Sequence, residues 1–178
     1  MTWKPLPIGI DNFEKIINGG YLYVDKTLFI KELLDMKGEV NLFTRPRRFG
    51  KTLNLSMLRY FLEAGNYDHS HLFKGLKIMN AGSSYLIHMG KYPVISLSLK
   101  SMKQPAFELA FDMLKKAIRE EFKRHWEEIN ASKRLSKVDE DRYLRLCDLN
   151  GNQSDYADAL RFFRVHVYLY REKDNHSY

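Results

Sequence analysis

A basic loop between a short apolar run and an amphipathic segment constrains this chain more than any other feature. Residues 39–64 read EVNLFT, then RPRRFGKT, then LNLSMLRYFLEAG. The apolar run is typical of a buried strand, and the large apolar residues after the loop are spaced as on one face of a helix. The loop therefore connects a predicted strand to a predicted helix, and it ends in Gly50, Lys51 and Thr52.

Gly-Lys-Thr is the closing half of a phosphate-binding P-loop, whose full pattern is G-x-x-x-x-G-K-[ST]. The first glycine would stand at position 45, which is Arg45, so the match is partial. In such a loop backbone N–H groups converge on phosphate oxygens, the lysine reaches the β- and γ-phosphates, and the hydroxyl helps to hold Mg²⁺. Gly50, Lys51 and Thr52 can fill these roles directly.

The remaining loop residues complete the predicted site. Three arginines add positive charge that can steer or clamp a triphosphate, whereas proline stiffens a loop that glycine normally opens. We therefore predict a nucleoside triphosphate site that uses ATP and Mg²⁺, with Thr52 contacting the metal that the nucleotide carries. The predicted site consists of Arg45, Pro46, Arg47, Arg48, Phe49, Gly50, Lys51 and Thr52.

Charge and apolar content bound the remaining possibilities. The net charge of +7 suits nucleic acid, a membrane surface or a polyphosphate ligand, and the 44% hydrophobic content is ample for a core. No apolar run approaches the roughly 20 residues that a membrane-spanning helix needs. The single cysteine, Cys147, is typical of a reducing setting. We expect a cytoplasmic protein without membrane contact.

The pattern of the chain predicts three regions. Residues 1–38 form a lead-in with short helices over 12–18 and 28–37. Residues 39–165 form a partial P-loop nucleotide-binding domain, with strands over 40–43 and 92–100 and a long helix over 105–129. Residues 166–178 form a tail. The predicted fold class is α/β and P-loop NTPase-like, with an incomplete parallel sheet flanked by helices and a helical lead-in at the N-terminus.

Hydrolysis requires one further element that the pattern does not supply. A strand that ends in Asp or Glu normally binds the metal and positions the attacking water. The run VISLSL ends at Lys100, and the run VYLY continues into Arg171. The sequence therefore predicts nucleotide binding more strongly than hydrolysis.

Several stretches resemble the AAA-ATPase-like family of bacterial P-loop proteins. These are LPIGIDNFEKIINGGYLYVDKTLFIKELL, NLFTRPRRFGKTLNLSMLRYFLE, LFKGLKI and KYPVISLSLK, and the resemblance covers residues 5–165. RPRRFGKT is the usual form of the P-loop in that family. The resemblance implies ATP binding through Gly50, Lys51 and Thr52, together with Mg²⁺. Family members continue into a strand ending LIDEYD, a lid region and a nuclease-like domain of the PD-(D/E)XK type, of which this chain contains nothing.

The tail suggests a hypothesis about this continuation. Suppose that the codons of REKDNHSY and the stop codon are translated in the reading frame that starts one nucleotide later. If Arg is encoded as AGR and the stop codon is TGA, the shifted frame can encode Gly-Lys-Lys-Thr-Ile-Ile-Leu-Ile-Asp. These residues would lead into the acidic strand that the family resemblance implies. We therefore expect a truncated chain with an out-of-frame tail, and the nucleotide sequence would test this.

Two alternatives belong to other functional classes. In the first, the chain is a nucleic-acid-binding module whose arginine-rich loop grips the phosphate backbone. In the second, it is an inert truncated fragment. A sheet interrupted before its acidic strand would leave an unpaired edge, through which self-association is expected.

Overall fold

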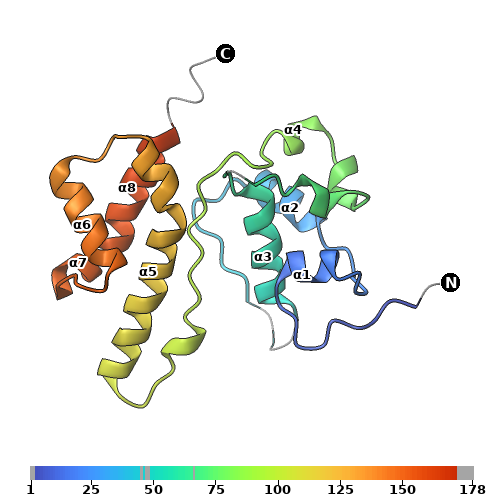
Figure 1. Cartoon of the computed structure of the whole chain (residues 1–178). Helices are drawn as coiled ribbons and strands as arrows, with labels where there is room; N and C mark the ends of the chain where they lie inside the picture. Colours follow the sequence, from blue (N-terminus) through green and yellow to red (C-terminus); the bar gives the residue numbers. More distant parts are fainter. Residues whose placement is uncertain (1–2, 45, 47–48, 66, 172–178) are drawn as a thin grey trace. The chain divides into compact units, whose positions relative to one another are not determined.

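The regular structure of this protein is helical (Figure 1). The structure is a computed structural model that describes residues 3–44, 46, 49–65 and 67–171, with side chains up to residue 166. The α-helices are α1 (Phe13–Asn18), α2 (Leu28–Met36), α3 (Lys51–Leu62), α4 (Ser83–Leu86), α5 (Phe107–Ala131), α6 (Lys137–Cys147), α7 (Gln153–Ala157) and α8 (Ala159–Arg171). Short 3-10 helices are η1 (Ser70–Phe73), η2 (Lys77–Asn80) and η3 (Lys100–Met102).

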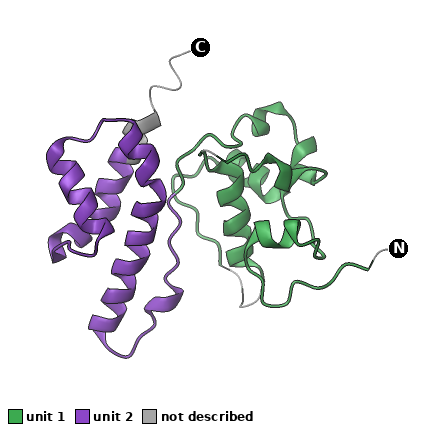
Figure 2. Ribbon diagram, viewed as in Figure 1, with its two compact units in different colours: residues 1–94 green, residues 95–178 purple. Residues whose placement is uncertain are grey.

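The chain divides into two compact units, Met1–Val94 and Ile95–Tyr178, and each has its own apolar core (Figure 2). The first unit contains the Gly-Lys-Thr segment at the start of α3. The predicted boundaries after residues 38 and 165 stay predictions, and so does the out-of-frame tail, because residues 172–178 lie outside the described part of the chain.

The predicted α/β fold with an incomplete parallel sheet is wrong. The described residues form no sheet, and their β-pairing is an isolated parallel bridge between Glu63 and Tyr92. Residues 40–43 and most of 92–100, which were predicted to be strands, run without ladder partners. An alternating pattern predicts a half-buried extended segment, but strand hydrogen bonds come from a neighbour that local sequence cannot supply. Val40 and Leu42 are accordingly 90% and 85% exposed.

The core of the first unit joins α1 and α3 through aromatic side chains. Phe13 and Phe61 are both fully buried, and each packs on Phe73, with ring centroids 5.1 and 5.3 Å apart. Rings at these separations contribute about 0.5–1.5 kcal/mol per pair beyond the burial of their area. The remaining buried members of this core are Ile30, Met57, Leu58, Tyr60, Leu72 and Ile78.

The Asp25 side chain links the lead-in to η2. Its Oδ1 accepts hydrogen bonds from the Thr27 N–H at 2.9 Å and the Thr27 hydroxyl at 2.7 Å, and its Oδ2 accepts from the Lys77 N–H at 2.8 Å. The fully buried Thr27 hydroxyl in turn accepts from the Ile78 N–H at 3.1 Å. Asp25 and Thr27 therefore do not cap α2, as such residues often do, but hold α2 against a segment about fifty residues away in the sequence.

The second unit packs α6 and α8 against the long helix α5, and α7 packs against α6 and α8. The predicted helix over 105–129 is confirmed with bounds of Phe107–Ala131, and Ile118 and Phe122 lie on its buried face as their spacing indicates. Phe122 stacks on Phe163 of α8 at 4.5 Å, and the Tyr143 hydroxyl donates to the Phe122 carbonyl at 2.7 Å. In the described part of the chain, no helix has the length and apolar character to cross a membrane.

We predict that Asp25→Asn lowers the free energy of unfolding by about 1–3 kcal/mol, because an amide offers one acceptor oxygen where the carboxylate offers two. Urea unfolding would measure this loss. Asp68→Asn is the matched control, because Asp68 makes a similar local pair of bonds to Ser70 but none to a distant segment. An equal or larger loss for Asp68→Asn would contradict the linking role of Asp25.

The effect of Asp25 should also depend on pH. Burial alone would raise the pKa of Asp25, but the hydrogen bonds from Thr27 and Lys77 outweigh it and hold the pKa below 3.8. A lowered pKa in the folded state gives stability that is present above the unfolded value and lost as pH falls through the folded value. The stability difference between the native chain and Asp25→Asn should therefore shrink on acidification below pH 3.8. A stability difference between the two chains that stays constant down to pH 2 would contradict a lowered pKa of Asp25.

Candidate functional site

The start of α3 carries the strongest candidate for a functional site. Gly50 precedes the helix with φ 73° and ψ 22°, a left-handed conformation that favours glycine. A Cβ on Gly50 would meet nothing within 4 Å, so glycine is required by the backbone conformation and not by space. Among the described residues no side chain caps this end of α3. The first turn of an uncapped helix presents backbone N–H groups and a partial positive charge.

The predicted site residues divide into described and undescribed ones. Lys51 and Thr52 are the first two residues of α3, and both are exposed. Pro46 and Phe49 are also exposed, with Phe49 56% accessible. Arg45, Arg47 and Arg48 lie outside the described residues, so their placement in the site stays a prediction.

Hydrogen bonds between α1 and α3 fix the position of the helix that begins at Lys51. The Phe13 N–H at the start of α1 donates to Ser56 Oγ at 3.0 Å. The Tyr60 hydroxyl accepts from Asn12 Nδ2 at 3.2 Å and donates to Glu14 Oε2 at 3.0 Å. Together with the aromatic core, these bonds hold α3 from its middle, which leaves its N-terminal turn at the surface.

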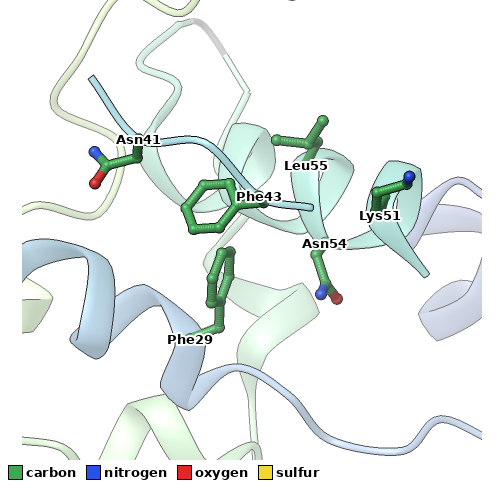
Figure 3. A pocket seen from close by; sticks show the side chains of 6 residues that line it. All are labelled: Phe29, Asn41, Phe43, Lys51, Asn54 and Leu55. Carbon is green, nitrogen blue, oxygen red and sulfur yellow. The ribbon is translucent and has the colours of Figure 1, made fainter. Parts of the chain in front are cut away.

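A cavity of about 210 Å³ adjoins this turn (Figure 3). Side chains two residues apart in an extended segment point to the same side, which places Asn41 and Phe43 together. Residues three and four apart on a helix are neighbours, so Lys51 lies next to both Asn54 and Leu55, whose side chains leave the helix on different sides (Figure 3). Phe29 of α2 closes the cavity, with its ring edge-to-face on Phe43 at 4.8 Å.

Asn54 is a functional candidate that the sequence interpretation missed. Its residue surface is 8% exposed, and within the described part of the chain its side chain makes no hydrogen bond. Asparagine is a poor residue for a helix interior and needs a partner when buried. The sequence does contain a signal for this candidate. An asparagine stands in the apolar face of LNLSML, three residues after Lys51.

A second cavity of about 230 Å³ lies against the same turn of α3. Its walls come mainly from the lead-in, including Leu22 and Val24, and it also touches Gly50, Leu53 and Asn54. It contains neither Lys51 nor an aromatic pair of the kind found in the first cavity. Asn54 therefore lies between two cavities of similar size and different chemistry.

A further cavity of about 520 Å³ lies near the other end of α3, where Glu63, Asp68 and His69 are among its lining residues. Burial lowers the pKa of His69 and so favours its neutral ring, which packs edge-to-face on Tyr60 at 4.9 Å. Among the described residues, no group of three or more His, Cys, Asp or Glu side chains is placed to hold a metal ion.

Comparison with known proteins adds the family. A family model described as "Predicted AAA-ATPase" matches residues 7–167 of this chain. The chain belongs to this family. The match confirms the family indicated by the sequence resemblance, and membership in the predicted AAA-ATPase family supports nucleotide and Mg²⁺ use in general.

A curated relative of this predicted AAA-ATPase is the "Uncharacterized protein in vnfD 5'region" of Azotobacter chroococcum mcd 1. It is 48% identical over 79 residues, which make up 44% of this chain and 14% of the relative. The chain thus matches only about a seventh of the length of that relative. No solved structure matches the chain.

We predict that Gly50→Ala lowers the free energy of unfolding by about 1–2 kcal/mol, because an L-residue is strained in the left-handed conformation. Urea unfolding measures the loss. Gly20→Ala is the control, since Gly20 has φ 66° and open space but lies away from α3. Gly20→Ala should be equally destabilising, whereas only Gly50→Ala should shift the amide NMR signals of Lys51 and Thr52. Unchanged stability of Gly50→Ala would contradict the left-handed start of α3.

Proposed function

We propose that this protein binds a nucleoside triphosphate, ATP in particular, through the loop 45–52, with the phosphates at the N-terminus of α3. The observation that carries the proposal is the start of α3: Gly50 is left-handed, no described side chain caps the helix, and Lys51 and Thr52 are exposed on its first turn. Anions bind well at such an end because the backbone N–H groups point outward and the helix dipole favours negative charge.

Each residue of the turn has a chemical role in this proposal. Lys51 pairs with the β- and γ-phosphates, and the Thr52 hydroxyl ligates Mg²⁺ that the nucleotide carries. Mg²⁺ usually keeps several waters and takes most of its other ligands from substrate phosphates, so a single hydroxyl from the protein suits it. The loop residues Arg45, Pro46, Arg47, Arg48 and Phe49 are proposed to surround the phosphates.

The proposal concerns binding and not hydrolysis. Hydrolysis requires a carboxylate that binds the metal and orients water. The described residues that line the cavity beside Lys51 are Phe29, Asn41, Phe43, Asn54 and Leu55, and none of them is acidic.

The nucleic acid alternative depends on Arg45, Arg47 and Arg48, which lie outside the described residues, so it stays a prediction. Self-association through a sheet edge loses its basis, because the described residues form no sheet. The cytoplasmic location also stays a prediction. The inert-fragment alternative is tested by the binding experiment below.

We predict that Lys51→Ala weakens binding of MgATP roughly 10- to 100-fold in isothermal titration calorimetry, because one charge-assisted contact is worth about 1.5–3 kcal/mol. Lys116→Ala is the control, since it removes the same charge from an exposed position on α5. MgATP at about 100 times Kd should also stabilise the native chain by about 2.7 kcal/mol.

Unchanged MgATP affinity in Lys51→Ala would contradict the proposal. Absence of any MgATP binding by the native chain would favour the inert fragment. DNA binding with a steep salt dependence and no competition by ATP would favour the nucleic acid alternative.

A further inference from the structure

The unpaired amide of Asn54 points to a ligand beside the start of α3. More than nine-tenths of this residue is buried, and it belongs to the wall of the cavity shared with Lys51. Within the described residues its amide has no hydrogen-bond partner. The Asn54 amide is not among the solvent-inaccessible unpaired atoms of the described residues, so it remains open to a group that enters the cavity. A ligand group that enters the cavity would supply the missing bonds.

The cavity walls indicate the chemistry of that group. Phe29, Phe43 and Leu55 provide flat or aliphatic apolar surface, and Asn41 and Asn54 provide amides. Figure 3 shows the two phenyl rings beside the turn of α3 that carries Asn54 and Leu55. Planar heteroaromatic rings with polar edges suit such walls, because their faces pack on apolar side chains and their edges need hydrogen bonds. A sugar or a second phosphate would not use the apolar walls.

We propose that this cavity receives the purine base of the bound nucleotide and that Asn54 reads an edge of adenine. This inference rests on the proposed function, because it assigns the base subsite of the same nucleotide. Lys51 lines the cavity and also begins the helix turn proposed to hold the phosphates, so one ligand can reach both places. A volume of about 210 Å³ suits one part of a ligand, since pockets for whole drug-sized molecules measure roughly 300–1,000 Å³.

The amide of Asn54 favours adenine over guanine. The Asn54 Nδ2 amino group can donate to adenine N7 while its Oδ1 accepts from the adenine N6 amino group, so that one donor and one acceptor on each side match. Guanine presents two acceptors, N7 and O6, at the equivalent edge and leaves the amide oxygen unpaired. Asn41 is less suited to this task, because its Nδ2 already donates to the Gly38 carbonyl at 3.0 Å.

The cavity formed with the lead-in is the competing location for the base. Asn54 also touches it, but its other walls offer no second amide and it does not include Lys51. The cavity beside Lys51 is therefore preferred, and paired variants can separate the two. Leu55 is 56% exposed and Val24 is 69% exposed, so a tryptophan at either position can be accommodated at the surface while it fills one cavity.

The first test compares the native chain with Asn54→Leu, using ATP, GTP and inorganic tripolyphosphate, each with Mg²⁺, in calorimetric titrations. The native chain should bind ATP about tenfold more tightly than GTP. Asn54→Leu should lose this preference and bind ATP about tenfold more weakly, with unchanged affinity for tripolyphosphate. Its melting temperature without ligand should not fall, because leucine has similar size and removes an unpaired amide. Retained ATP affinity and preference in Asn54→Leu would overturn the inference.

The second test compares Leu55→Trp with Val24→Trp. Leu55→Trp should weaken ATP binding at least about tenfold and leave tripolyphosphate binding unchanged, whereas Val24→Trp should leave both unchanged. The reverse pattern would place the base in the cavity of the lead-in and overturn the assignment. If the proposed function itself is wrong, the native chain will bind neither ATP nor tripolyphosphate, which is a different result from either pattern above. Equal affinity for ATP and tripolyphosphate would overturn only the base subsite.

Discussion

The packing of α3 against α1 positions the helical turn that carries Lys51 and Thr52. Phe13 and Phe61 pack on the same ring, that of Phe73, and the Phe13 N–H donates to Ser56 Oγ. These contacts secure the middle and the C-terminal end of α3, and its first turn lies at the surface with no capping side chain among the described residues. Gly50 then turns the chain into the helix through a conformation that other residues adopt only with strain. The exposed first turn is thus a consequence of the core beneath it.

Two local features of the site oppose stability and favour ligand binding. No described side chain caps the N-terminus of α3, and the Asn54 amide makes no hydrogen bond among the described residues. Natural sequences usually break such local rules at functional positions, where a ligand completes the missing interactions. Both features lie within one helical turn, at Gly50 and Asn54, and Lys51, which follows Gly50, shares a cavity with Asn54. Their proximity is the reason for assigning phosphate and base to one ligand.

The local parts of this structure could be predicted from the sequence, and the parts that depend on distant partners could not. The helix after Gly50 and the long helix over Ile118 and Phe122 follow from apolar spacing, and the family follows from the motifs. The predicted sheet failed because Val40 and Leu42 have strand-forming character but no neighbouring strand among the described residues. The cavity requires α2, which the bond from Lys77 to Asp25 helps to hold in place across 52 positions of sequence. No local pattern reveals that bond.

The central claim is that backbone amides at the start of α3 bind phosphate. An NMR titration of the ¹⁵N-labelled chain with tripolyphosphate and Mg²⁺ tests it without involving the base. The amide signals of Lys51, Thr52 and Leu53 should show the largest shifts and should saturate along one binding curve. The start of α5 is a built-in comparison, because no described side chain caps α5 either, and α5 follows no Gly-Lys-Thr segment. Shifts that fail to saturate, or that are as large at Phe107 and Glu108, would contradict the claim.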